Sequence, residues 1–238
     1  MRGMGVKKLN ITYLAIENDD IVYNRESRFW ASRNISSHRV YSMSEGIKAA
    51  STEQFLFIGI NAANVDYVSS LSLLRDVTNA PILISTDKYS MQEQGKALSL
   101  GADLFGQISD YPADNYTSVM AAIGRVNAQA KQPKAPVVLL LSDNILMSHT
   151  HRRVFVADTE VALTRVDFDI LYMLMENSGR VLSPEQIYSH VWEDKEEQSV
   201  YNSVMCAIKR LRKKISLHGN IRDDIIQKVW GVGYKFAL

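Results

Sequence analysis

An apolar run at residues 55–60, FLFIGI, ends without the carboxylate that such a strand often carries. Strands of this kind lie buried in α/β sheets, whose sites form at the carboxyl ends of the strands. Here that end holds Gly59 and Asn61, neither of which is acidic. A different apolar run precedes Glu17 and Asp19 and so does end beside acids. The first chemical question is what a sheet does with no acid at the centre of its site.

A second cluster of chemically useful residues lies in the stretch 203–215, SVMCAIKRLRKKI. Its apolar residues recur at helical spacing, so a helix here would turn them toward a core. The rest of its surface is basic and holds no acid: Lys209, Arg210, Arg212, Lys213 and Lys214. A charge run alone is most often a solvated helix face. The order of the surrounding elements favours contact with nucleic acid instead.

The composition is that of an ordinary globular protein of about two domains. The chain has 238 residues, of which 46% are hydrophobic and 22% charged, with a net charge of +1. No apolar run reaches the ~18 residues that a membrane span needs, and the amino terminus lacks the pattern of a secretory signal. A lone cysteine, Cys206, suits a reducing compartment, so we expect a cytoplasmic protein. Because the chain has no phosphate loop, metalloprotease motif or nucleophile elbow, we expect no enzyme, cofactor or metal site.

The first half of the chain alternates strand-like and helix-like segments. Apolar or alternating runs predict strands at 11–16, 38–43, 55–60, 81–86 and 103–108. Helical patterns are found at 21–32, after Ser44, and at 67–77, 90–100 and 113–130. Strands separated by helices of this length form a parallel sheet that is covered on both faces. The order predicts a flavodoxin-like α/β domain with a five-stranded parallel sheet over residues 1–130.

A short proline-containing linker, predicted at 131–136, separates this domain from a second one at 137–238. The second domain begins with four short β runs that are too close together for crossovers, so they form an antiparallel platform. Three helices follow, with starts predicted at Thr164, at Ser183 and near Ser199, and a last hairpin turns at Gly231-Val232-Gly233. A basic third helix before a glycine hairpin predicts an α+β winged helix-turn-helix domain.

Several spaced motifs in the second half resemble one protein family. The segments LTRVDFDILYMLMENSGRVLSPEQIYSHVW, VMCAIKRLRKKI and VWGVGYKF are similar to the effector domain of the OmpR/PhoB-type response regulators. The resemblance covers the carboxyl half nearly end to end. It implies that the third helix enters the major groove of DNA while the hairpin wing rests on a minor groove. It also implies a receiver domain in the amino half, whose order of elements and GAD motif at 101–103 match.

Receivers of this family carry a phosphate-accepting aspartate at the end of the third strand. An acidic pair after the first strand binds Mg²⁺, a hydroxyl ends the fourth strand, and a lysine ends the fifth. The resemblance places the acids at Glu17-Asn18-Asp19, the hydroxyl at Thr86, and the lysine at Ile108 or, in a shifted register, Gln107. The acceptor falls on Gly59, or on Asn61 if the register slips by two. Neither residue can form an acyl phosphate, and isoleucine cannot neutralise one. We therefore expect a pseudo-receiver, which lacks the phosphoacceptor, in a regulator that acts independently of aspartyl phosphorylation.

The winged-helix plan predicts two sets of DNA contacts. Phosphate contacts are expected from Thr164, Arg165, Lys213 and Tyr234. Groove contacts are expected from Asn202, Ser203, Met205, Cys206, Lys209 and Arg210, and Arg212, Trp230 and Gly231 complete the set. If Arg210 binds a guanine, it carries part of the specificity. Trp230 stands where many family members place an arginine, and it could pack either on a sugar or on the domain's own surface.

The expected partners are double-stranded promoter or operator DNA, a second copy of the chain, and RNA polymerase. Family members dimerise through helix four, strand five and helix five. This chain offers both charged and apolar residues there: Glu93, Lys96, Asp103, Arg125, Val119, Met120 and Ile123. The apolar residues predict a constitutive homodimer through the receiver-like domain. The acidic loop 192–198 could meet RNA polymerase or merely stay clear of DNA phosphates.

Two other functions are compatible with the sequence. One is a conventional two-component regulator that is phosphorylated on a different acid. The other is a ligand-sensing or protein-interaction module whose winged helix no longer binds DNA. DNA binding that weakens steeply with salt separates a DNA-binding regulator from such a module, because phosphate contacts release counterions.

Overall fold

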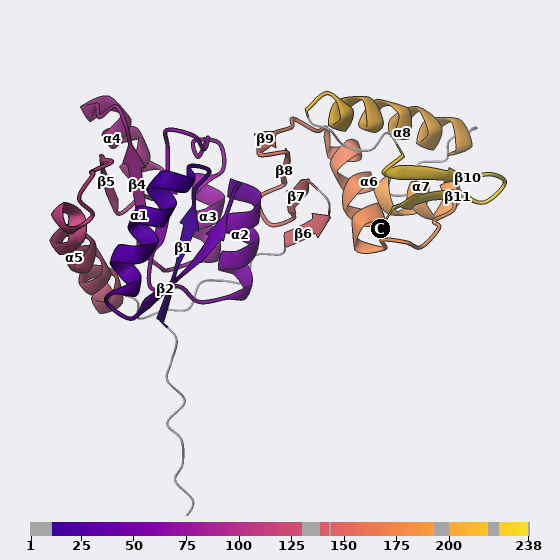
Figure 1. Ribbon diagram of the computed structural model, residues 1–238. Coiled ribbons are helices and arrows are strands. Elements are labelled where there is room, and N and C mark those ends of the chain that lie inside the picture. The colour runs from indigo at the N-terminus through magenta and orange to yellow at the C-terminus, as the bar shows by residue number, and fades with distance from the viewer. Residues whose placement is uncertain (1–10, 130–138, 143, 193–199, 219–223, 238) are drawn as a thin grey trace, which may run out of the picture. The chain divides into compact units, whose positions relative to one another are not determined.

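The computed structural model describes residues 11–129, 139–142, 144–192, 200–218 and 224–237 (Figure 1). The chain divides into two compact units, residues 1–136 and 137–238, and each is considered by itself. The predicted linker at 131–136 and most of the acidic loop at 192–198 lie outside the described residues. Within the described ranges, no helix is both long and apolar enough to cross a membrane.

The first unit is a five-stranded parallel sheet with the strand order β2-β1-β3-β4-β5, which confirms the predicted flavodoxin-like fold. Its strands are β1 (Ile11–Ile16), β2 (Ile35–Val40), β3 (Ile58–Asn61), β4 (Ile82–Thr86) and β5 (Leu104–Gln107). Its helices are α1 (Asp20–Ala31), α2 (Met43–Thr52), α3 (Leu71–Val77), α4 (Met91–Ser99) and α5 (Ala113–Gln129). The carboxyl ends of β1, β3 and β4 are neighbours, because Ile16 pairs with Ile60 and Asn61 pairs with Ser85.

The second strand differs from its predicted position at 38–43. It begins earlier, because Asn34 takes a positive φ of 60° after α1 and the chain enters the strand at Ile35. It also ends earlier, because the Ser42 side chain accepts a hydrogen bond from the Glu45 backbone N–H at 3.2 Å and caps α2. The prediction was therefore too late by about three residues at each end, since local capping decided the boundaries.

The second unit has the predicted winged helix-turn-helix architecture. An antiparallel sheet in the order β6-β7-β8-β9 is formed by Leu139–Ser142, Ile145–Ser148, Arg153–Val156 and Thr159–Glu160. Helices α6 (Arg165–Glu176), α7 (Pro184–Val191) and α8 (Val200–Ser216) follow, and β10 (Ile226–Val229) and β11 (Gly233–Phe236) form the wing. One buried cluster joins the platform, all three helices and the wing.

Local signals in the sequence explain where these elements begin and turn. Ser183 and Gln186 form a reciprocal capping box, and Pro184 occupies the first turn of α7. In the wing, a Cβ on Gly233 would lie 2.0 Å from the Leu182 carbonyl oxygen, and the residue has a φ of +158°. Only glycine fits there, so the wing can pair closely with the segment before α7, where Leu182 and Tyr234 exchange backbone hydrogen bonds.

Candidate DNA-binding surface and receiver site

Helix α8 presents one buried and one exposed face. Its buried side chains, Val204, Ala207, Ile208, Leu211 and Ile215, belong to the core of the unit. Besides Arg210, five α8 residues predicted to contact DNA are exposed: Asn202, Met205, Cys206, Lys209 and Lys213. Their spacing of three or four residues places them along one side of the helix. The predicted recognition face is thus assembled on the surface, with Lys209 and Lys213 as its cations.

A buried carboxylate joins α8 to the start of α6. The Asp167 side chain is fully buried, and its Oδ1 accepts two hydrogen bonds from Arg210, from Nε at 2.9 Å and from a terminal nitrogen at 2.7 Å. Its Oδ2 accepts one from Lys214 Nζ at 3.0 Å. Burial alone would raise the pKa of Asp167, but hydrogen bonds from Arg210, Lys214 and Thr164 lower it below its ordinary value. The acid is therefore charged at neutral pH and holds two helices together.

This arrangement gives Arg210 an internal partner that the sequence did not reveal. Asp167 lies 43 positions earlier, and its place three residues after Thr164 had indicated only a helix cap. About half of the Arg210 side chain is exposed, but its Nε and one terminal nitrogen are directed at Asp167. The expected bidentate contact with a guanine competes with this ion pair, so we assign Arg210 to the positioning of α8.

The wing is fastened to α8 by two cations. Arg212, which was predicted to contact DNA, is half-buried and donates a hydrogen bond to the Ile226 carbonyl in β10. Lys228 Nζ donates to the Tyr201 hydroxyl at 2.9 Å, and the same ammonium lies 4.4 Å from the centre of the Trp230 ring. Arg212 thus positions the wing rather than standing free on the surface.

The tip of the wing is an exposed apolar wedge. Trp230 is 85% exposed and Val232 is 55% exposed, with Gly231 between them at a φ of +72°. This φ lies in the left-handed region, which glycine adopts more readily than other residues, and this explains Gly231 at the turn. Of the two alternatives for Trp230, packing on the domain's own surface is wrong, because the ring contacts little of the unit beyond Lys228.

The remaining predicted DNA contacts divide between surface and core. Thr164 and Arg165 are exposed at the start of α6, and Ser203 is half-buried on α8. Tyr234 is only 2% exposed and packs in the core cluster, where burial raises the pKa of its hydroxyl. The expectation that Tyr234 contacts a phosphate is therefore wrong. Its position in the alternating pattern of β11 turns its side chain inward.

In the first unit, one of the two positions predicted for the phosphoacceptor, Asn61, holds a buried amide. Asn61 is the last residue of β3 and is 3% exposed. Its Nδ2 donates to both carboxylate oxygens of Glu17, at 3.0 and 2.8 Å, while its Oδ1 accepts from the Ala63 backbone N–H at 3.0 Å. Of the two registers left open by the sequence, Asn61 is the one beside Glu17. Gly59 lies two residues earlier on the same face of the strand and has no polar side chain to offer.

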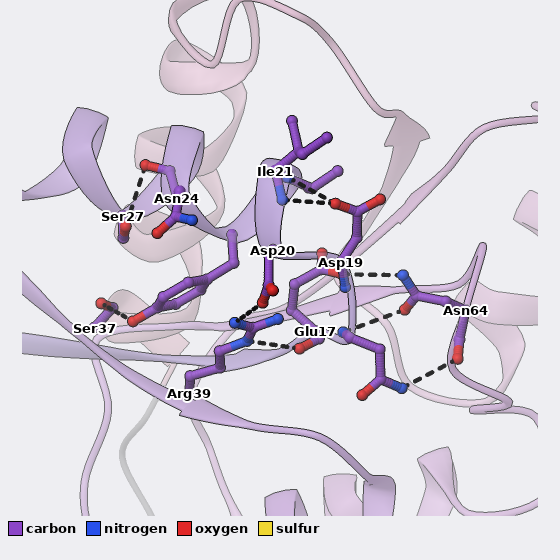
Figure 2. A network of polar contacts seen from close by, with 12 residues as sticks. Glu17, Asp19, Asp20, Ile21, Asn24, Ser27, Ser37, Arg39 and Asn64 are labelled. Atoms are coloured by element: carbon purple, nitrogen blue, oxygen red, sulfur yellow. Dashed lines mark hydrogen bonds and ion pairs between the residues drawn. The ribbon is translucent and has the colours of Figure 1, made fainter.

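The Glu17 carboxylate is satisfied by further neutral donors (Figure 2). Asn64 Nδ2 donates to Glu17 Oε1 at 3.1 Å, and the Asp19 backbone N–H donates to the same oxygen at 2.7 Å. Glu17 is 6% exposed, so these donors replace the water that burial removed. The Glu17 carboxylate is thus surrounded by amide and backbone N–H donors.

The other acids of the site are also committed to local structure. Asp19 Oδ1 accepts from the backbone N–H groups of Ile21 and Val22, at 2.7 and 3.1 Å, and caps α1. Asn18 Nδ2 donates to the Asn64 carbonyl at 3.3 Å. Among the residues that the structure describes, no group of three or more His, Cys, Asp or Glu side chains could hold a metal ion. Asp19 and Asn18 are thus both engaged in local hydrogen bonds.

The hydroxyl and lysine positions of the predicted site are held by Thr86 and Ile108. Thr86 is buried, and its Oγ1 accepts from the Lys88 backbone N–H at 3.2 Å. Ile108 follows β5, where its backbone N–H donates to the Thr86 carbonyl at 2.8 Å. No ammonium therefore comes from the position at which a receiver would place its lysine.

The face predicted for dimerisation is less apolar on α5 than expected. Val119 and Ile123 are 6% and 5% exposed and belong to the core, so they cannot join two copies. Exposed apolar side chains are found instead at Met91 and Leu98 of α4 and at Met120 of α5. Asp103 is paired within its own unit, since Arg75 donates to it at 3.0 Å. The seventeen-residue α5 is amphipathic, and its apolar side chains Val119 and Ile123 pack in the core beside the sheet.

Comparison with known proteins identifies relatives among bacterial regulators. The family model described as "Transcriptional regulatory protein, C terminal" matches residues 158–236. The regulatory protein VanRc of Enterococcus gallinarum is 31% identical over 173 residues, which cover 72% of this chain and 74% of that protein. The response regulator ArlR of Staphylococcus aureus is 31% identical over 162 residues, 68% of each chain. The structure of DrrB from Thermotoga maritima, described as an OmpR/PhoB homolog, is 20% identical over 96% of this chain and 99% of that one, with a TM-score of 0.39.

Proposed function

Because the chain belongs to the OmpR/PhoB-type response regulators, we propose that it binds double-stranded promoter or operator DNA through its winged helix and regulates transcription without aspartyl phosphorylation. The observation that carries the DNA-binding part is the exposed face of α8. Asn202, Met205 and Lys209 project from it next to a wing whose tip is uncovered. This is the surface that a helix in a major groove needs.

The wing supports contact with a minor groove. Trp230 offers a large apolar ring at the tip, and Lys228 offers a cation beside it. Apolar side chains inserted at base steps and cations near phosphates are recurring parts of minor-groove binding. We assign Trp230 to the sugar or base edge and Lys228 to a nearby phosphate. Lys213, Thr164 and Arg165 are assigned to phosphates of the major-groove side.

The Asn61–Glu17 pair supports independence from phosphorylation. A neutral amide oxygen is too weak a nucleophile to attack phosphorus as a carboxylate oxygen does, and the neighbouring acid is occupied by neutral donors. A phosphoryl group would also add up to about two negative charges, which no lysine at Ile108 would neutralise. We assign the phosphoacceptor position to Asn61. We infer that the sequence, the protein concentration or a bound ligand sets the fraction of the protein that is in its active state.

The same proposal includes the organisation of the chain. We assign residues 1–130 to the receiver-like domain, 131–136 to a linker and 137–238 to the effector domain of a cytoplasmic regulator. A homodimer would use the α4–β5–α5 face with Met91, Leu98 and Met120, in place of the buried Val119 and Ile123. Contact with RNA polymerase is assigned to the acidic segment at 192–198, most of which lies outside the described residues.

The experiment that tests DNA binding uses the full chain and a duplex selected from fragments of the source genome. Affinity is measured by fluorescence anisotropy over a series of salt concentrations. Lys213→Gln should flatten the slope of log K against log salt by about 1, because one phosphate contact is lost. Lys48→Gln, on an exposed lysine of α2, is the matched control and should leave the slope unchanged. A slope near zero for the unaltered protein would favour a winged helix that binds protein instead of DNA.

A further inference from the structure

A cavity lies inside the first unit, between the sheet and helices α1 and α5. Its volume is about 120 Å³. Residues from both helices and from four strands, β1, β3, β4 and β5, line it, chiefly Tyr13, Trp30, Phe57, Leu83, Leu104 and Val119. An engineered cavity of about 150 Å³ in another protein holds one benzene molecule, so this space suits a single six-membered ring. Cores rarely leave such a space empty without a cause in the sequence.

Two glycines on strands that flank β4 create the space. Gly59 of β3 and Gly106 of β5 both line the cavity. Two positions after each glycine, Asn61 and Ile108 line it as well. A Cβ on Gly106 would meet no atom within 4 Å, and one on Gly59 would approach only the Leu14 carbonyl, at 4.0 Å. Neither glycine has a positive φ. The backbone therefore does not require glycine at either strand position, and glycine there costs stability.

A buried hydroxyl in the wall has no partner. Tyr13 is 3% exposed, and its hydroxyl has no hydrogen-bond partner among the described residues. Its ring stacks on Phe57 with centroids 4.8 Å apart, which fixes the direction of the hydroxyl. A buried donor without an acceptor is costly, so its persistence points to a group that binds it.

The charges around the cavity limit the ligand. The lining contains Glu17 and Glu26 but neither lysine nor arginine among the described residues. Glu17 is held by Asn61 and Asn64, and Glu26 accepts a hydrogen bond from Trp30 Nε1 at 3.3 Å. An anionic ligand would meet two acids and no cation. Gln107, which is exposed, also lines the space and marks its access from the surface.

We propose that this cavity binds a small neutral molecule, about the size of one ring and carrying a polar oxygen or nitrogen that accepts a hydrogen bond from Tyr13. The apolar ring would pack between the aromatic cluster of Trp30 and Phe57 and the leucines of β4 and β5. Binding does not depend on the DNA-binding function proposed above, because every lining residue belongs to the first unit. The cavity adjoins the acidic site of a receiver, because Glu17, Asn61 and Ile108 are among its lining residues, and it extends from there between the sheet and helices α1 and α5.

The test uses methyl NMR on the full chain with phenol and toluene, which have nearly the same shape and differ in one substituent, a hydroxyl in phenol and a methyl in toluene. Phenol should shift the methyl signals of Leu83, Leu104 and Val119 and bind more tightly than toluene. Tyr13→Phe should weaken phenol binding by about tenfold, the loss of one buried hydrogen bond, and leave toluene binding unchanged. The same variant should raise the thermal midpoint of the free protein, because an unpaired donor is removed.

Gly106→Val should fill the cavity, raise the thermal midpoint and abolish the shifts with both compounds. Gly95→Ala is the matched control, since Gly95 is an exposed glycine of α4 and does not line the cavity. It should raise stability through helix propensity and leave phenol binding intact. The proposal is overturned if neither compound shifts the three methyl signals. It is also overturned if Gly106→Val binds phenol as the unaltered protein does.

Discussion

Glu17 and Asp167 are both buried acids, but each unit of the protein satisfies its acid differently. Glu17 accepts hydrogen bonds from the amides of Asn61 and Asn64 and from a backbone N–H. Asp167 accepts hydrogen bonds from two cations of α8, Arg210 and Lys214. The acid of the first unit lies in a neutral shell, whereas the acid of the second is the centre of an ion-pair network.

The two acids therefore have different consequences. The amides around Glu17 close its site, whereas the ion pairs of Asp167 with Arg210 and Lys214 form a clamp between α6 and α8. A receiver needs unbalanced negative charge to attract Mg²⁺ and a nucleophile to modify, and the amides around Glu17 supply neither. A recognition helix needs a fixed orientation, and the ion pairs of Asp167 fix α8 against the start of α6. Glu17 is thus enclosed by neutral donors, whereas Asp167 fixes the helix that we propose to bind DNA.

The largest effect is expected from breaking the clamp with Asp167→Asn. Removal of the charge leaves Arg210 and Lys214 without their acid and should cost about 2–3 kcal/mol in the free energy of unfolding of the second unit. Calorimetry or urea denaturation measures the loss. Asp169→Asn is the control, because Asp169 is paired with Arg152 and lies outside this network. A loss below that of the control would mean that the clamp contributes nothing.

The stability difference between the unaltered protein and Asp167→Asn should depend on pH with a definite sign. The pKa of Asp167 is lower in the folded protein than in the unfolded chain, so its contribution is complete above the unfolded value of about 3.9. The contribution is lost as the pH falls through the folded pKa. The two proteins should therefore differ most at neutral pH and converge below about pH 4. A difference that grows on acidification would contradict the assignment.

Asn61→Asp should have a smaller effect on stability, and it tests the neutral shell around Glu17 in the first unit. The new carboxylate would lie within about 3 Å of Glu17, where two like charges repel, and should destabilise the first unit by about 1–2 kcal/mol at neutral pH. Its folded pKa would be raised, so the loss appears above about pH 4 and disappears below it. Mg²⁺ should restore part of the stability of this variant and none in the unaltered protein. Equal responses to Mg²⁺ would mean that the amide shell does not exclude the ion.

Trp230→Ala tests whether the clamp and the DNA contact are separate. Because Trp230 is 85% exposed, its removal should leave the free energy of unfolding nearly unchanged. Affinity for a selected duplex should fall by about 1–1.5 kcal/mol, roughly tenfold, as one aromatic contact is lost. Val232→Ala, at the same turn, should lose less because its side chain is smaller. Unchanged affinity would remove the wing from the DNA-binding surface.

Much of the fold was predictable because it depends on local patterns. Apolar periodicity gave the five strands and the three effector helices, and Thr164 and Ser183 marked two helix starts through their caps. The strand at 38–43 was misplaced because its boundaries depend on Asn34 and Ser42 rather than on apolar pattern.

The candidate sites were less predictable because they depend on residues that are distant in the chain. The partner of Arg210 lies 43 positions away, and only the fold brings it into contact. Tyr234 and Val119 were assigned to surfaces, yet each belongs to the core, since an amphipathic element has one face of each kind. The cavity depends on Gly59 and Gly106, which pair with Leu83 and Ser85 of β4, and no short motif in the sequence indicates this register.

The most direct test of phosphorylation independence is incubation of the unaltered protein with acetyl phosphate and Mg²⁺. Intact-mass analysis and acid-lability measure the phosphate that is bound, and anisotropy with the selected duplex measures DNA affinity before and after treatment. A response regulator with an intact acceptor site serves as the positive control. Because the amide of Asn61 cannot be phosphorylated as an aspartate is, and Ile108 provides no cation, no acid-labile phosphate should appear and the affinity should be unchanged. Stoichiometric labelling of Asp19, Asp66 or any other acid, with a change in DNA affinity, would contradict the account.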